Sequence, residues 1–559
     1  REVKNMIRKK GLSGGVILLM SLLFLLFSAR PSQAAVIYVT QEGAGLRNGS
    51  SWSNACGEAE FKTALDNAEA GSEIEFWVAK GTYRPSFSAG PDTPADREAS
   101  FVLKSGMTLY GGFAGGETNV RQRDYRKNVT VLTGDLKGDD SANPDGVTET
   151  AAGIVGENSY TVVTSFGAAA PNTGILDGFT ITGGSADFPD NIGGPKQYGG
   201  GMHNTGSKAV VRNCSFRGNS AVWGGGAICN ISSNIRLGYC TFSGNGAMSG
   251  AGMYNQASSP ELVSCTFSGN TVRADAAAIH NYDGSSPTIS GCIFTGNEAE
   301  RDVGAIANVD HCSPLIINCT FSGNISKKGI FGGGAIGNSD HCNAEIISCT
   351  FDGNAAEEGL GGAITNTAYS DAKIVNCTFF ANSAVSGGGM YNFMCSPSIV
   401  NCTFSNNSAD TAGGMRNSDS GTPVVKNCIF WDNPGETGNE IVNDGGAAPV
   451  VSFCVINGGY PGGTSIFTGS PNLGLLKDNG GYTKTHALLT GSSAIDKGTS
   501  SGAPSDDQRG YPRPQGSAYD IGSYEFAPSS DSGGGCSAAF YSGTVPVLLL
   551  FPMILLLRK

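Results

Sequence analysis

The stretch Ser398-Ile399-Val400-Asn401-Cys402-Thr403-Phe404 decides the fold, because variants of it return along much of the chain. The pattern Cys-x-Phe-x-x-Asn occurs nine times at intervals of 25 to 30 residues, and Cys454 begins a degenerate tenth copy. Short alternating segments at this period cannot be amphipathic helices, which need longer runs with a period of 3.6 residues. Each copy is therefore predicted to form one coil of a parallel β-solenoid, with the array spanning residues 200–469. The nine repeat cysteines are Cys214, Cys240, Cys265, Cys292, Cys319, Cys349, Cys377, Cys402 and Cys428.

Stacking of the coils predicts which side chains meet. In an alternating strand Val400, Cys402 and Phe404 should point into the core, and Asn401 and Thr403 should point outward. Successive coils lie about 4.8 Å apart, so ten coils would form a rod roughly 48 Å long, in which equivalent residues form ladders. The cysteines should act as small apolar core residues. Most should remain thiols, because a disulfide needs Cβ atoms about 3.8 Å apart.

Two sets of asparagines repeat with the cysteines. One set follows each phenylalanine by three residues, and the other belongs to Gly-Gly-x-x-x-Asn elements 10 to 11 residues before each cysteine. The first set is predicted to stack at a turn, with amides bonded from coil to coil and a left-handed backbone.

The two ends of the chain look like targeting segments. Residues 1–35 combine basic residues, an apolar run and the small residues Ala34 and Ala35, which predicts a signal peptide cleaved by signal peptidase. An uncleaved anchor is the alternative. Residues 528–559 combine a polar spacer, Gly533-Gly534-Gly535-Cys536, a hydrophobic stretch predicted to be helical, and Arg558-Lys559. This order predicts a membrane-held tail.

The tail resembles the Gly-Gly-Gly-Cys sorting tails found in Synergistetes and myxobacteria. The resemblance implies that Cys536 is the processing or anchoring residue and that a sorting protease is a partner. A simple C-terminal membrane anchor is the alternative, and it implies the same surface location.

The array and the segments before it resemble exported β-helix proteins. Gly333-Gly334-Ala335-Ile336 with Phe351-Asp352-Gly353-Asn354 resembles the repeats of chlamydial polymorphic outer-membrane proteins, which are surface autotransporters and adhesins with β-helical passengers. Residues 78–83, 109–113 and 176–181 resemble opening coils of pectate-lyase-like right-handed parallel β-helices. We expect an N-terminal cap and first coils over residues 36–135, with an amphipathic helix near residues 60–70, and early coils with loop insertions over residues 136–199.

Residues 470–527 break the period. Their motifs at residues 478–489, 494–498, 507–510 and 520–525 resemble the choice-of-anchor Q domain, which recurs in exported β-helix proteins with assorted surface anchors and brings no catalytic role. We expect this segment to close the C-terminal end of the solenoid as a cap. Arg509 should pair there with Asp507, Asp520 or Glu525.

The variable loops contain the candidates for chemistry. A polysaccharide lyase on this fold would need a basic residue to remove a proton beside a uronate carboxylate. The runner-up catalytic candidates are Arg301, Lys327, Lys328, Glu298 and Asp302. The competing interpretation is a solvated ladder of charges that alternate in sign between neighbouring coils.

A second candidate site consists of two copies of Asp-His-Cys that lie 30 residues apart. Its members His311, His341, Cys312 and Cys342 should lie on adjacent coils. Two histidines and two cysteines could bind zinc. Cys312 and Cys342 could instead form a disulfide, or the four side chains could stack unbonded.

Composition limits the function. The chain has 559 residues, of which 83 are glycine and 15% are charged, with a net charge of -12. This excludes a coiled coil or a charge-rich disordered chain and makes nucleic acid an unfavourable partner. The leading prediction is an exported, surface- or membrane-anchored stalk, adhesin or envelope component without catalysis or cofactor, with glycans or surface proteins as partners. The runner-up is a polysaccharide lyase or glycoside hydrolase acting on acidic glycans. A peptide-binding scaffold is a third hypothesis.

Overall fold

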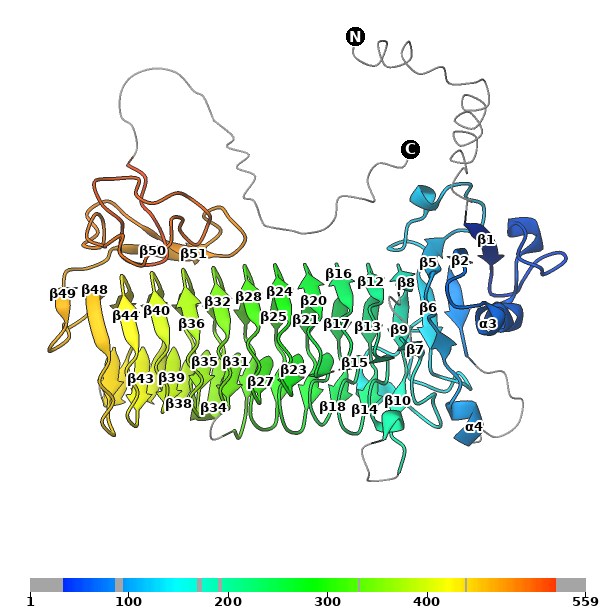
Figure 1. Cartoon of the computed structure of the whole chain (residues 1–559), viewed down its shortest axis with the longest axis horizontal. Coiled ribbons are helices and arrows are strands. Elements are labelled where there is room, and N and C mark those ends of the chain that lie inside the picture. Colours follow the sequence, from blue (N-terminus) through cyan, green and yellow to red (C-terminus); the bar gives the residue numbers. More distant parts are fainter. Residues whose placement is uncertain are drawn as a thin grey trace, which may run out of the picture.

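The chain winds as a right-handed parallel β-helix around one continuous hydrophobic core, which confirms the predicted fold class (Figure 1). The computed structural model describes residues 34–85, 94–167, 173–189, 194–329, 332–437 and 440–528. The predicted signal helix, the predicted C-terminal hydrophobic helix and Gly533, Gly534, Gly535 and Cys536 lie outside these residues. Among the described residues, no helix is both long enough and apolar enough to cross a membrane.

Sheet 1 is the longest sheet and contains 27 strands, of which each repeat coil contributes two. Its strands are β1 (Ala35–Val39), β2 (Ile74–Ala79), β3 (Gly81–Tyr83), β5 (Met107–Phe113), β6 (Thr130–Thr133), β8 (Ile175–Asp177), β9 (Thr180–Thr182), β12 (Val210–Arg212), β13 (Ser215–Arg217), β16 (Arg236–Gly238), β17 (Thr241–Ser243), β20 (Glu261–Val263), β21 (Thr266–Ser268), β24 (Thr288–Ser290), β25 (Ile293–Thr295), β28 (Leu315–Ile317), β29 (Thr320–Ser322), β32 (Glu345–Ile347), β33 (Thr350–Asp352), β36 (Lys373–Val375), β37 (Thr378–Phe380), β40 (Ser398–Val400), β41 (Thr403–Ser405), β44 (Val424–Lys426), β45 (Ile429–Trp431), β48 (Val450–Ile456) and β49 (Thr464–Phe467).

Sheets 2 and 3 complete each coil. Sheet 2 has twelve parallel strands: β4 (Phe101–Val102), β7 (Val163–Phe166), β11 (Met202–Thr205), β15 (Ile228–Ile231), β19 (Met253–Gln256), β23 (Ile279–Tyr282), β27 (Ile306–Val309), β31 (Ile336–Ser339), β35 (Ile364–Asn366), β39 (Met390–Phe393), β43 (Met415–Ser418) and β47 (Ile441–Asn443). Sheet 3 has ten parallel strands: β10 (Ser185–Ala186), β14 (Ser220–Ala221), β18 (Gly246–Ala247), β22 (Thr271–Val272), β26 (Glu298–Ala299), β30 (Ile325–Ser326), β34 (Ala355–Leu360), β38 (Ser383–Ser386), β42 (Ser408–Thr411) and β46 (Gly435–Thr437).

A left-handed residue before each repeat cysteine bends the chain between the two strands of sheet 1. Asn401, with φ of 52°, separates β40 from β41. The bend resets the alternation of side chains, so Ile399 joins Cys402 and Phe404 in the core while Val400 lies outside the core cluster. The prediction that Val400 points into the core is therefore wrong, because simple alternation takes no account of a corner.

Ladders of identical residues fill the rod as predicted. The repeat phenylalanines stack with ring centroids 4.2 to 5.2 Å apart. Each buried ring contributes roughly 1.5–3 kcal/mol through burial. The repeat cysteines are buried free thiols. Burial raises the pKa of the first of them, Cys214, to about 12, so this thiol stays protonated and unreactive.

The asparagine set that follows the phenylalanines forms a buried ladder. Each side-chain Nδ2 donates to Oδ1 of the next asparagine at 2.8 to 3.1 Å. The left-handed residue, however, is the one before each asparagine, such as Gly353 before Asn354, with φ of 66°. The side chain of each asparagine is held in the core, so the residue before it makes the turn. The other asparagine set forms a second ladder with distances of 2.8 to 2.9 Å.

A short helix closes the N-terminal end of the core. The helix α3 (Glu58–Asn67) buries Phe61 and Leu65. The Phe61 ring lies 5.7 Å from Phe76 of β2 and 5.8 Å from Tyr83 of β3. A solenoid needs such a cover because its first coil otherwise exposes apolar side chains and an unpaired strand. The other helical segments are α4 (Pro94–Arg97) and 3-10 turns at Trp52–Asn54, Val120–Gln122, Ala151–Gly153 and Pro195–Gln197.

The C-terminal end is closed by local residues. Tyr460 and Ile466 pack against the core, and the Tyr460 hydroxyl accepts a 2.8 Å hydrogen bond from Asn443, the last member of the second ladder. The first ladder ends at Asn433, whose Nδ2 donates to Glu440 Oε2 at 2.5 Å.

Residues 470–528, hereafter the C-terminal unit, lie along the side of sheet 1 over its last coils (Figure 1). The unit contains an antiparallel pair, β50 (Leu473–Lys477) and β51 (Thr485–Leu488). Its placement differs from the expected end cap. The reason is that polar groups facing outward from the coils hold the unit on the side of the rod, while Tyr460 and Ile466 already cover the end.

Candidate functional site

The two candidate lysines, which follow β30 of sheet 3, are held in ion pairs with the neighbouring coil. Lys327 pairs with Glu298, and Lys328 pairs with Glu300 of the preceding coil. The hydrogen bond to Glu298 raises the pKa of Lys327. A lysine that acts as a base must be readily deprotonated, so this shift opposes the lyase role. The arrangement is the ladder of alternating charge that the sequence suggested.

The remaining two catalytic candidates face other neighbours. Arg301 lines a shallow groove of about 880 Å³ together with Arg273 and Glu300. Asp302 lies near Asp275 instead, and burial together with this second carboxylate raises the pKa of Asp302. Four of the five candidates, Arg301, Lys327, Lys328 and Glu298, therefore lie in one charged region around Glu300, whereas Asp302 faces Asp275. The groove offers two guanidinium groups that can hold an anion, and Glu300, its one lining carboxylate, is paired with Lys328.

The four residues of the proposed zinc site do not converge. Cys312 and Cys342 are fully buried, whereas the side chains of His311 and His341 are 66% and 53% exposed. The two imidazole rings stack with centroids 5.3 Å apart. Ligand atoms of Asp310, His311 and Asp340 all lie within 4.8 Å of one another on this exposed turn.

Cys312 and Cys342 belong to a column of hydrogen-bond acceptors that serine occupies in other coils. The backbone N–H of Cys312 donates to Cys342 Sγ at 3.0 Å, and that of Cys342 donates to Ser370 Oγ at 3.0 Å. In an earlier coil, the backbone N–H of Ser233 donates in the same way to Ser258 Oγ at 2.9 Å. Both cysteines are free thiols in the structure, and each sulfur has a place in this column.

Gln508 fastens the C-terminal unit to the coils. Its side-chain Nε2 donates to Thr350 Oγ1 and to Thr483 Oγ1, both at 2.9 Å, and its Oε1 accepts from Thr378 Oγ1 at 2.7 Å. Thr350 and Thr378 each follow a repeat cysteine and face out of the core. Because Gln508 is 2% exposed, these bonds are made where water cannot replace them.

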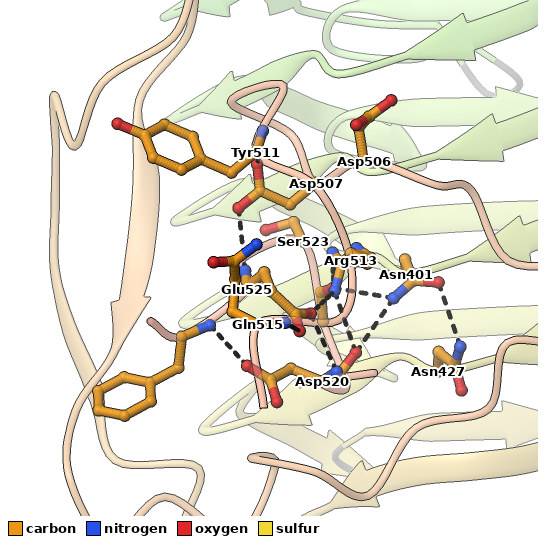
Figure 2. Close-up of polar contacts among 12 residues, drawn as sticks. Asn401, Asn427, Asp506, Asp507, Tyr511, Arg513, Gln515, Asp520, Ser523 and Glu525 are labelled. Carbon is orange, nitrogen blue, oxygen red and sulfur yellow. Dashed lines mark hydrogen bonds and ion pairs between the residues drawn. The ribbon is translucent and has the colours of Figure 1, made fainter. Parts of the chain in front are cut away.

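A buried cluster of ion pairs gives the C-terminal unit its shape (Figure 2). Arg509 pairs with Asp507 at 2.7 Å, as predicted. Glu525 pairs instead with Arg513 at 2.8 Å, and both of these side chains are completely buried. Arg513 was not among the predicted members of the cluster, although an arginine between two prolines in a segment with nearby acidic motifs is a usable signal.

Backbone groups complete the same cluster. Arg513 donates to the carbonyl oxygens of Asp520 and Gly522 at 3.2 and 2.8 Å. Asn401 of the solenoid donates to the same two carbonyl oxygens at 3.2 Å, which links the cluster to the rod (Figure 2). Burial raises the pKa of Asp520 to about 7. Buried charges that are paired and bonded in this way fix one arrangement of the unit.

Comparison with known proteins gives a family match. The model of the right handed beta helix region matches residues 176–324 and 304–478, which together exceed half of the chain. A search of curated proteins finds no match. Among solved structures, the crystal structure of pectate lyase Pel9A aligns over 88% of this chain and 97% of its own, with 12% sequence identity and a TM-score of 0.30.

Proposed function

The chain belongs to the right-handed β-helix family, and from this premise we propose that it is an exported rod, held at the cell envelope, that acts as a stalk, adhesin or envelope component without catalysis. The observation that carries the proposal is the buried attachment of the C-terminal unit. Arg513 and Glu525 are fully buried, and Phe526 N–H donates to Asp520 Oδ2 at 2.6 Å. The segment that leads into residues 528–559 is therefore fixed to the rod just before the proposed anchor begins.

The proposed export and attachment at the cell envelope rest on the two terminal segments. Signal peptidase would cleave near Ala34 and Ala35, and a sorting protease would process the tail at Gly533, Gly534, Gly535 or Cys536. Mass spectrometry of the mature chain tests both sites. We expect an N-terminus near residue 35 and either a shortened C-terminus or a modified Cys536. A mature chain that retains both ends unmodified would contradict the proposed processing.

The absence of catalysis is a separate expectation with its own test. The purified chain should release no unsaturated product from polygalacturonate, as followed by ultraviolet absorbance. The ion pairs of Lys327 and Lys328 with glutamates support this expectation. Turnover that disappears in Lys327→Ala or Arg301→Ala would replace the stalk by the alternative, a polysaccharide lyase or glycoside hydrolase that acts on acidic glycans. Lys373→Ala, which removes an exposed lysine paired with Glu345 on another face, is the matched control.

A further inference from the structure

We propose that an aromatic pocket on the outer face of sheet 2 binds a neutral sugar residue of a glycan. The pocket is lined by Tyr198, Trp223, Tyr254, Asp275, His280 and Tyr282. The inference rests on the proposed non-catalytic binding role and gives that role a site and a class of ligand.

The parallel register brings the pocket residues together from different coils. Tyr254 of β19 and His280 of β23 are paired neighbours in sheet 2, and both face away from the core. Their rings lie 5.3 Å apart at 72°. Tyr198 comes from an earlier coil, and its ring lies 5.5 Å from that of Tyr254. The volume of about 430 Å³ is in the range of small-ligand sites.

The rim of the pocket exposes two large aromatic side chains. Trp223 is 39% exposed and Tyr282 is 37% exposed. Aromatic rings present a broad apolar face beside a polar tip, and tryptophan and tyrosine supply much of the binding energy in recognition sites. A sugar ring has an apolar face of C–H groups surrounded by hydroxyls, which matches such a surface.

One polar residue that lines the pocket lacks hydrogen-bond partners. His280 is 7% exposed, and neither ring nitrogen makes a hydrogen bond within the described residues. The nearest charged group is Asp275, whose Oδ2 lies 3.6 Å from Nδ1 and accepts from Ser249 Oγ at 2.7 Å. Burial lowers the pKa of His280, so the imidazole is neutral and offers one donor and one acceptor. Buried polar atoms without partners are costly, which favours a ligand that supplies both.

These features select among ligand classes. A hydroxyl group both donates and accepts, so a sugar can satisfy the ring nitrogens of His280 once the imidazole turns toward the pocket, because both nitrogens are covered in the unbound structure. A quaternary ammonium ion would suit the rings but would leave these nitrogens unsatisfied. A uronate would place its carboxylate near Asp275, which repels it. The pocket therefore fits a neutral hexose better than a cation or an acidic sugar.

Calorimetry and tryptophan fluorescence on the full mature protein test the inference. The probes are cellohexaose, mannohexaose and maltohexaose, with hexagalacturonate and choline as the competing classes. We expect saturable binding of at least one neutral hexamer and a loss of affinity of about tenfold or more in Trp223→Ala. His280→Gln should also weaken binding. The control Tyr239→Ala removes another exposed aromatic ring, on sheet 1, and should bind as the wild type does.

The outcomes separate this inference from the proposed function. Circular dichroism must first show that Trp223→Ala keeps the wild-type fold, which its exposed position favours. Failure of all three neutral hexamers to bind, binding of only choline or hexagalacturonate, or neutral binding that is unchanged in Trp223→Ala would each overturn the inference. None of these results would affect the stalk proposal, whereas chemical conversion of any hexamer would overturn that proposal.

Discussion

The buried asparagine ladder ends on one carboxyl group, and its ionisation should control the stability of the last coils. Asn433, the last asparagine of the ladder, donates through Nδ2 to Glu440 Oε2 at 2.5 Å and through its backbone N–H to Oε1 at 3.4 Å. Glu440 is 5% exposed. Burial raises the pKa of Glu440 from 4.5 to about 7. We predict that Glu440→Gln makes the stability of the last coils insensitive to pH between about 4.5 and 7.

The size of the effect follows from the pKa shift. A rise from 4.5 to about 7 corresponds to about 3 kcal/mol, because one pKa unit equals about 1.4 kcal/mol. The folded state binds this proton more tightly than the unfolded chain does. Its contribution to stability is therefore complete below about pH 4.5 and is lost as the pH rises through about 7. A glutamine amide oxygen can accept both bonds from Asn433, as Oδ1 of each asparagine does within the ladder, and it carries no charge.

Hydrogen–deuterium exchange with mass spectrometry can measure this locally, which matters because a solenoid need not unfold in one step. Peptides from residues 424–456 should lose up to about 3 kcal/mol of opening free energy between pH 5 and 8 in the wild type, after correction for intrinsic exchange. The same peptides should change little with pH in Glu440→Gln. Glu436→Gln, which alters an exposed carboxyl group on β46, is the control and should behave as the wild type does. Equal pH dependence in the wild type and Glu440→Gln would refute the role of Glu440.

Three further predictions concern the C-terminal unit and the cysteine column. Gln508→Ala leaves the Thr378 hydroxyl without one of its buried partners and should cost about 1–3 kcal/mol, so trypsin should cleave within residues 470–528 faster while the solenoid keeps its circular dichroism spectrum. Arg513→Ala leaves the Glu525 carboxylate buried and unpaired and should destabilise the unit by about 3–5 kcal/mol, with part of this restored when Glu525 is also replaced by alanine, as urea titration would show. Cys312→Ser should change the urea midpoint by the equivalent of less than about 1.5 kcal/mol, because serine fills this column in other coils, and thiol titration of the denatured wild type should detect Cys312 as free.

Periodic information in the sequence was sufficient to predict the core of this protein. Phe321, Asn324 and Cys319 each recur once per coil, so their position in one coil determines their neighbours in the next. The corner at Asn401 was not predicted, because asparagine at that position is consistent with either a strand or a left-handed bend. Because of that ambiguity, Val400 was predicted to face the core, whereas it lies outside the core cluster.

Contacts between residues that do not recur from coil to coil could not be predicted from the sequence. The bonds from Gln508 to Thr350 and Thr378 join residues more than 120 positions apart, and no repeated pattern connects them. The charge ladder of Glu298 and Lys327 was foreseen because charged residues of opposite sign follow the repeat asparagine in successive coils, although the register places Glu298 opposite Ile325. The aromatic pocket was missed because the outward column that contains Tyr254 and His280 has no consensus residue, so the repeat gave no expectation there. Alignment of the outward column that contains Tyr254 and His280 would have revealed two neighbouring rings.

The docking of the C-terminal unit depends on the unit more than on the rod. Threonine follows the repeat cysteine in upstream coils as well, at Thr241 and Thr266, and both of these side chains remain at least partly exposed. The equivalent Thr350 and Thr378 are completely buried beneath the unit. Since the same residue in the same register is open in one part of the rod and covered in another, the repeat provides a uniform surface. Specificity must then come from Gln508 and its neighbours, together with the short connection from β49 that restricts the unit to the last coils.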